Sequence, residues 1–126
     1  MVFQVRNPID SWKSYKGNDW VWEHHRLRIY SAKQFAHMWN HLADGFLQFA
    51  DELGAMVVRY EDLTSDADET IAKLEGYLDL KLDPDVLQDK VTGNTLSGSM
   101  KEPATPSEIA SIKKITKSAA AKLGYF

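Results

Sequence analysis

The sequence contains no cysteine, and this absence excludes disulfide bonds and thiolate metal sites. No apolar run is long enough to span a membrane, and no secretory signal peptide precedes the first predicted strand, so we expect a cytoplasmic chain. A strong positive charge is also missing, because the formal net charge is −3, whereas nucleic-acid binding depends on clustered Lys and Arg. We therefore expect neither nucleic acid nor a membrane as a partner.

A glycine-rich phosphate loop with an adjoining lysine is absent as well. The one candidate, residues 93–99, has no strand before it, no helix directly after it and no Lys-Ser/Thr pair, so we interpret it as a loop. The composition that is present fits one domain, because 126 residues with 44% apolar side chains can form a single core. We expect one domain over residues 1–126.

Apolar periodicity predicts a strand, a helix, a long helix and a second strand in the first half of the chain. Their ranges are about 2–6, 8–17, 31–53 and 55–60. One wide apolar stripe follows the long helix: Phe35, Met38, Trp39, Leu42, Phe46, Phe49 and Leu53. Strand, helix and strand in this order imply two parallel strands joined by a crossover helix.

Three further helices are expected downstream. The first begins at Thr64 or Ser65 and turns four residues inward: Ile71, Leu74, Tyr77 and Leu78. A short helix begins at Asp83-Pro84, and a capping box from Thr105 to Glu108 opens the last helix. That helix turns another five residues inward: Ile109, Ile112, Ile115, Ala119 and Leu123.

The predicted fold class is α/β, with parallel strands flanked by helices in an incomplete sheet. Two parallel strands leave open edges and an uncovered apolar face unless further strands join them. Three explanations stay open: a truncated reading frame, a polypeptide that completes the domain, or a homo-oligomer that pairs the exposed edges. We favour truncation.

The junction between the first strand and the first helix predicts a phosphate site. Arg6 ends the strand, and Asn7 can cap the helix that follows. An anion there would meet unpaired N–H groups of the helix N-terminus and a guanidinium able to bind two phosphate oxygens. Ser11 and Ser14 share one helix face nearby. The structural alternative is that Arg6 only pairs with Asp10 and that Ser14 is an ordinary solvated residue.

The run Arg6-Asn7-Pro8-x-Asp10-x-x-x-Ser14-Tyr15 resembles the 3′-phosphate-binding motif of sulfotransferases that use 3′-phosphoadenosine 5′-phosphosulfate (PAPS). Residues 57–63 resemble the family's later strand and its Tyr-Glu-Asp turn, and residues 123–125 resemble a frequent chain ending. The resemblance implies that Arg6 and Ser14 hold the 3′-phosphate of PAPS or of adenosine 3′,5′-bisphosphate. It also implies that Tyr60 lies near the adenine, the alternative being a buried aromatic whose hydroxyl finds a local partner.

The resemblance covers essentially the whole chain but only the carboxyl-terminal half of such a domain, and it implies a partial P-loop-like sulfotransferase fold. In the family, the 5′-phosphosulfate loop and the usual catalytic base lie upstream of the Arg6 motif, so we assign no catalytic residue. The implied function is binding of the 3′-phosphate and adenine side of PAPS, the co-substrate, for sulfuryl transfer to an unidentified acceptor hydroxyl or amine. The alternative is a non-catalytic nucleotide-phosphate-binding module, or a subunit completed by a partner chain.

Other polar and aromatic residues admit a functional and a structural interpretation. Glu61 and Asp62 are expected to orient their turn rather than to perform acid–base chemistry. A metal at His37, His41 and Asp44 is disfavoured, because the same spacing fits the polar flank of an amphipathic helix, and no metal is expected. Seven further residues are candidates for acceptor or phosphate contacts: Lys13, Lys16, Trp20, Trp22, His24, His25 and Lys101. Trp39 is expected only to pack.

Overall fold

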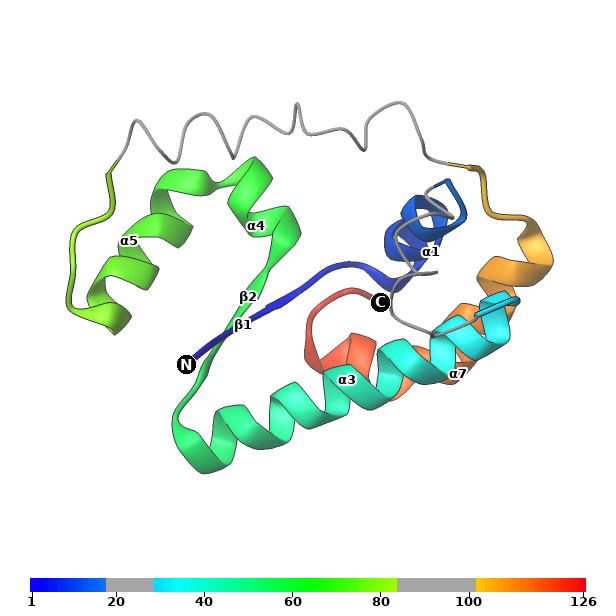
Figure 1. Ribbon diagram of the computed structural model, residues 1–126, viewed down its shortest axis with the longest axis horizontal. Coiled ribbons are helices and arrows are strands. Elements are labelled where there is room, and N and C mark those ends of the chain that lie inside the picture. The colour runs from blue at the N-terminus through cyan, green and yellow to red at the C-terminus, as the bar shows by residue number, and fades with distance from the viewer. Residues whose placement is uncertain (18–28, 84–101) are drawn as a thin grey trace.

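Two short parallel strands and the helices around them make up the part of the chain described by the computed structural model (Figure 1). The described residues are 1–17, 29–83 and 102–126. Their elements follow in this order: β1 (Val2–Val5), α1 (Pro8–Lys16), α3 (Ala32–Leu53), β2 (Met56–Arg59), α4 (Tyr60–Ser65), α5 (Ala67–Leu78) and α7 (Pro106–Lys122). This mixture of helix and strand confirms the predicted α/β class.

The sheet has the predicted parallel topology. Val2 lies opposite Met56 and Val5 lies opposite Arg59, and α3 lies between the two strands in the sequence. Only these two strands pair within the described residues, which confirms the prediction of an incomplete sheet. Because both strands end at the same edge, the residues that follow them enter one shared region.

Local sequence signals set the ends of the two longest helices. The Ser31 hydroxyl accepts a hydrogen bond from the Gln34 N–H at 3.2 Å at the start of α3, and Gly54 ends that helix at a φ of 61°. At the start of α7, Thr105 and Glu108 form the predicted reciprocal capping box. These ends agree with the prediction because each depends on residues only a few positions apart.

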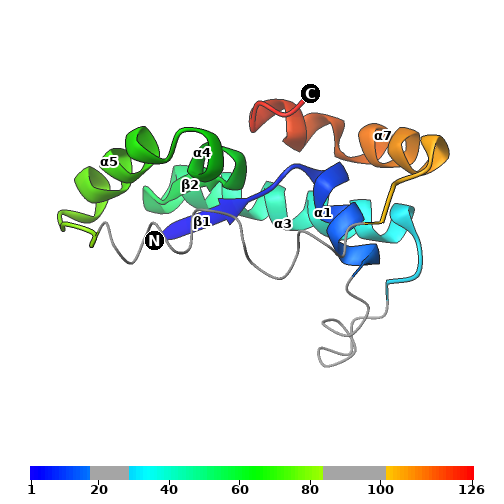
Figure 2. The same ribbon diagram turned by 90° about the horizontal axis from the view of Figure 1, so that it is seen from above.

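The core lies mainly between α3 and α7, which run side by side over the N-terminal half of α3 in both views (Figure 1, Figure 2). Small residues let the two helices approach closely, since Ala36, Ala119 and Ala120 are fully buried. Larger apolar side chains fill the space on either side, among them Phe35 and Ile112. Of the five inward positions predicted for α7, three are buried: Ile112, Ala119 and Leu123.

The apolar stripe predicted along α3 is buried only in part. Phe35 and Trp39 are buried in the N-terminal half of the helix, but Leu42, Phe49 and Leu53 are 48%, 46% and 61% exposed. These residues, with Phe3 of β1 and Phe46 of α3, line an open cavity of about 580 Å³. The reason is the incomplete sheet, because no further layer of the described residues covers this half of the helix.

The helix expected from Thr64 or Ser65 also differs from the structure. α4 follows β2 directly, and α5 begins after Asp66, whose side chain makes no capping hydrogen bond. Tyr77 and Leu78, which were expected to turn inward, are each 39% exposed. The amphipathic spacing correctly predicted a helix here. It could not show that few of the described residues pack against the apolar face of α5, which carries Tyr77 and Leu78.

Several predictions lie outside the described residues. They concern the short helix predicted from Asp83-Pro84, of which only Asp83 is described, the loop at 93–99, and five side chains: Trp20, Trp22, His24, His25 and Lys101. Among the helices that the structure describes, none combines the length and apolar character needed to cross a membrane.

Candidate functional site

The junction of β1 and α1 lies at the carboxyl edge of the sheet. The Asn7 side-chain oxygen caps α1, accepting hydrogen bonds from the N–H groups of Ile9 at 2.9 Å and Asp10 at 3.4 Å. The Ser11 N–H donates to the Asn7 carbonyl at 2.9 Å, and Pro8 has no N–H. The expectation of unpaired N–H groups at this helix N-terminus is therefore wrong. An anion here would depend on side chains and on the remaining helix dipole.

Arg6 provides the positive charge of this junction. Its guanidinium carbon lies 4.6 Å from the centroid of the Tyr60 ring, a cation–π distance. Asp10 pairs instead with Lys13 at 3.1 Å, so the alternative in which Arg6 pairs with Asp10 is wrong. Within the described ranges, no carboxylate lies at ion-pair distance from Arg6. The contact with Tyr60 holds the guanidinium without supplying a hydrogen-bond acceptor for its N–H groups.

Two of the three predicted site residues are in direct contact. Tyr60 begins α4 immediately after β2, and its half-buried ring lies beside Arg6 because both residues follow paired strands. Ser14 lies in the second half of α1 and is half-buried. Its role at the phosphate stays a prediction, as does the role of Tyr60 at the adenine.

The carboxylate of Glu61 joins this junction to the C-terminal segment. One of its oxygens accepts a hydrogen bond from the Asn7 N–H at 2.8 Å, and the other accepts from the Tyr125 hydroxyl at 3.0 Å. The Arg59 guanidinium lies 4.8 Å from the centroid of the Tyr125 ring and donates to the Gly124 carbonyl at 3.3 Å. Glu61 was expected to orient its own turn; its hydrogen bonds instead join two segments that are far apart in the sequence.

Trp39 is buried in the core, as expected, and it also reaches the junction. Its indole N–H donates to the Arg6 carbonyl at 3.0 Å, and its ring meets the Tyr125 ring edge-on at a centroid distance of 6.3 Å. No local pattern in the sequence indicates this hydrogen bond, because the indole N–H donates to a residue 33 positions away. The one available signal is chemical: a buried tryptophan needs an acceptor for its N–H.

Tyr125 keeps its proton in this setting. Burial and the negative charge of Glu61 raise the pKa of the Tyr125 hydroxyl well above the usual value for tyrosine, although Arg59 opposes the shift. The hydroxyl is therefore a hydrogen-bond donor to Glu61 across the physiological pH range.

The two candidate lysines on α1 contact other groups. Lys16 donates to the Pro103 carbonyl at 3.1 Å and to Glu108 at 3.3 Å, while Lys13 pairs with Asp10. Neither lysine is thus an unpaired cation beside Arg6. In the described part of the chain, no three His, Cys, Asp or Glu side chains gather closely enough to hold a metal.

Comparison with known proteins identifies a family for this chain. The family model described as the sulfotransferase domain matches residues 1–121, which is nearly the whole chain. Neither the curated proteins nor the solved structures give a significant match.

Proposed function

The chain belongs to the sulfotransferase domain family, and from this premise we propose that it binds the 3′-phosphate and adenine side of PAPS. The bound nucleotide would serve sulfuryl transfer to an acceptor hydroxyl or amine. The observation that carries the proposal is the Arg6 guanidinium, which lies against Tyr60 at the carboxyl edge of the parallel strands and has no carboxylate partner among the described residues.

The three predicted residues take distinct parts in this proposal. Arg6 binds two oxygens of the 3′-phosphate, because a guanidinium offers paired N–H donors in a fixed plane. Ser14 adds a neutral hydrogen bond to the same phosphate. Tyr60 contacts the adenine, since a phosphate on Arg6 brings the attached nucleoside within reach of a ring whose centroid lies only 4.6 Å from the guanidinium carbon.

The proposed reaction divides into binding and chemistry. The bond between sulfur and the phosphate oxygen of PAPS breaks while a bond forms from the acceptor oxygen or nitrogen to sulfur. The acceptor proton passes to a base, and adenosine 3′,5′-bisphosphate leaves. The described residues of this chain are proposed to orient the nucleotide, which lowers the barrier by fixing the reacting groups in line. None of them is assigned the role of general base.

A second candidate is a nucleotide-phosphate-binding module completed by a partner chain. The incomplete sheet and the apolar cavity beside β1 favour it, because another polypeptide could cover both. The assignment to one domain and the cytoplasmic location stay predictions.

Calorimetric titration of the folded chain tests the proposed function. Adenosine 3′,5′-bisphosphate is the ligand, and adenosine 5′-monophosphate, which lacks the 3′-phosphate, is the control. We expect tighter binding of the bisphosphate. Equal affinity for the two ligands, or no binding by chain shown to be folded by circular dichroism, would contradict the 3′-phosphate site.

A further inference from the structure

One peptide group beside the proposed phosphate site is held at both of its polar atoms. The carbonyl of the Arg6–Asn7 peptide accepts a hydrogen bond from the Trp39 indole at 3.0 Å, and its N–H donates to Glu61 at 2.8 Å. Because a peptide group is planar, these two bonds on opposite sides oppose rotation of the whole unit. They therefore fix the backbone from which the Arg6 side chain projects.

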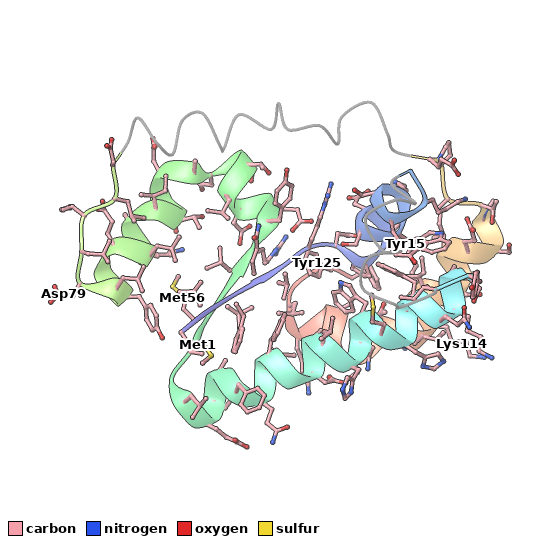
Figure 3. All side chains as sticks on the ribbon, in the orientation of Figure 1. Met1, Tyr15, Met56, Asp79, Lys114 and Tyr125 are labelled. Carbon is pink, nitrogen blue, oxygen red and sulfur yellow. The ribbon has the colours of Figure 1, made fainter. Side chains whose placement is uncertain are left out.

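Both groups that hold this peptide contact the same residue of the C-terminal segment. The Tyr125 hydroxyl donates to the second Glu61 oxygen, and the Tyr125 ring packs edge-on against Trp39. Figure 3 shows Tyr125 in the tail that follows α7, beside the point where β1 leads into α1. The Tyr125 side chain thus contacts both the Trp39 indole, which donates to the Arg6 carbonyl, and the Glu61 carboxylate, which accepts from the Asn7 N–H.

The tail that carries Tyr125 is itself anchored. Arg59 covers the Tyr125 ring and donates to the Gly124 carbonyl. Gly124 has a φ of 76°, and a β-carbon added there would lie 3.0 Å from the Arg59 guanidinium. A glycine therefore suits both the backbone conformation and the close approach of Arg59.

From these contacts we propose that Tyr125 is a positioning residue of the nucleotide-phosphate site, acting through Glu61 and Trp39 on the Arg6–Asn7 peptide. This inference rests on the proposed function. Tyr125 does not touch the nucleotide in this proposal; it sets the direction in which the Arg6 guanidinium points. Removal of its hydroxyl frees one Glu61 oxygen and loosens the carboxylate that holds the Asn7 N–H.

Tyr125→Phe tests the proposal most selectively, because it keeps the ring contacts with Trp39 and Arg59 and removes only the hydrogen bond. We expect its affinity for adenosine 3′,5′-bisphosphate to fall about 2- to 10-fold, the range for one hydrogen bond, with a much smaller change for adenosine 5′-monophosphate. Tyr77→Phe is the matched control. The Tyr77 hydroxyl likewise hydrogen-bonds to residues far away in the sequence, namely the main-chain oxygens of Met1 and Gly54, but these lie at the amino ends of the two strands.

A double-mutant cycle separates positioning from a general effect on the fold. If Tyr125 acts by orienting Arg6, Tyr125→Phe should cause no further loss of affinity in a chain that already carries Arg6→Ala. An equal loss with and without Arg6 would overturn the proposal. Glu61→Gln should largely preserve binding, because its carbonyl can accept from Asn7 and its amide can donate to the Tyr125 oxygen, whereas Glu61→Ala should weaken it.

Hydrogen exchange of the Asn7 amide provides a test without ligand. We expect the exchange rate, measured by NMR, to rise about 2- to 10-fold in Tyr125→Phe and to stay unchanged in Tyr77→Phe, as one weakened hydrogen bond implies. An unchanged exchange rate of the Asn7 amide in Tyr125→Phe would overturn the proposed positioning role of Tyr125. Equal affinity of the wild-type chain for the two nucleotides would overturn the proposed function itself. If Tyr125→Phe keeps the full wild-type preference for adenosine 3′,5′-bisphosphate over adenosine 5′-monophosphate, the positioning role of Tyr125 is overturned and the proposed function is not.

Discussion

Replacement of Arg6 by alanine is the sharpest test of the site. A hydrogen bond from a charged group contributes about 1.5–3 kcal/mol, so Arg6→Ala should weaken binding of adenosine 3′,5′-bisphosphate roughly 10- to 150-fold. Binding of adenosine 5′-monophosphate should change much less, because that ligand has no 3′-phosphate. The assay is calorimetric titration of each variant with both nucleotides at one salt concentration.

The structure also predicts the effect of this substitution on stability. Among the described residues, the substitution removes the cation–π contact between the Arg6 guanidinium and the Tyr60 ring. The free energy of unfolding, measured by urea denaturation, should therefore fall by only about 0.5–1 kcal/mol. The variant should thus remain folded, and its lost affinity can be assigned to the site. Lys117→Ala, which removes one positive charge from an exposed position on α7, controls for net charge. Equal weakening of both nucleotides by Arg6→Ala would refute the assignment of Arg6 to the 3′-phosphate.

Three further predictions concern the site and the fold. Ser14→Ala should lower affinity for adenosine 3′,5′-bisphosphate about 2- to 10-fold by calorimetry, the range for a neutral hydrogen bond, while no change in a folded variant would favour Ser11 as the ligand. Thr105→Ala removes one half of the α7 capping box and should lower the free energy of unfolding by about 0.5–2 kcal/mol in urea, with an unchanged midpoint as the contrary result. Because the folded state raises the pKa of Tyr125, its protonated hydroxyl contributes stability that is complete below pH about 10 and is lost as the pH rises further. Raising the pH above about 10 should therefore lower the free energy of unfolding of the wild-type chain more than that of Tyr125→Phe. Parallel profiles of unfolding free energy against pH for the two proteins would contradict this.

Those parts of the fold that depend on neighbouring residues could be predicted from the sequence. The capping hydroxyl of Ser31, the left-handed Gly54 and the predicted Thr105 capping box each act within a few positions, and the ends of both helices lie close to those predicted. The contact between Arg6 and Tyr60 was also accessible, since two parallel strands that end at one edge bring the following residues together.

Predictions that needed knowledge of the surroundings were less successful. Amphipathic spacing shows which face of α3 is apolar, but it cannot show whether a partner layer covers Phe49 or Leu53. The expectation of free N–H groups at α1 overlooked that Asn7, predicted as the cap, satisfies those same donors. The contacts of Trp39 and Tyr125 with the junction span long sequence separations, which no local pattern encodes.

The contacts of Tyr125 with Glu61 and Trp39 have a consequence for the order in which the site is completed during synthesis. β1, α3 and β2 lie within residues 2–59, so the strand pair can form before the residues that follow are translated. Glu61, in contrast, must wait for a partner 64 positions further along before its second oxygen is bonded. On a ribosome, where N-terminal segments emerge first, the Arg6 turn would be present early and locked only after residue 125 has emerged. Recognition of the 3′-phosphate would then mature only after Tyr125 has been made, although Arg6 is made well before it.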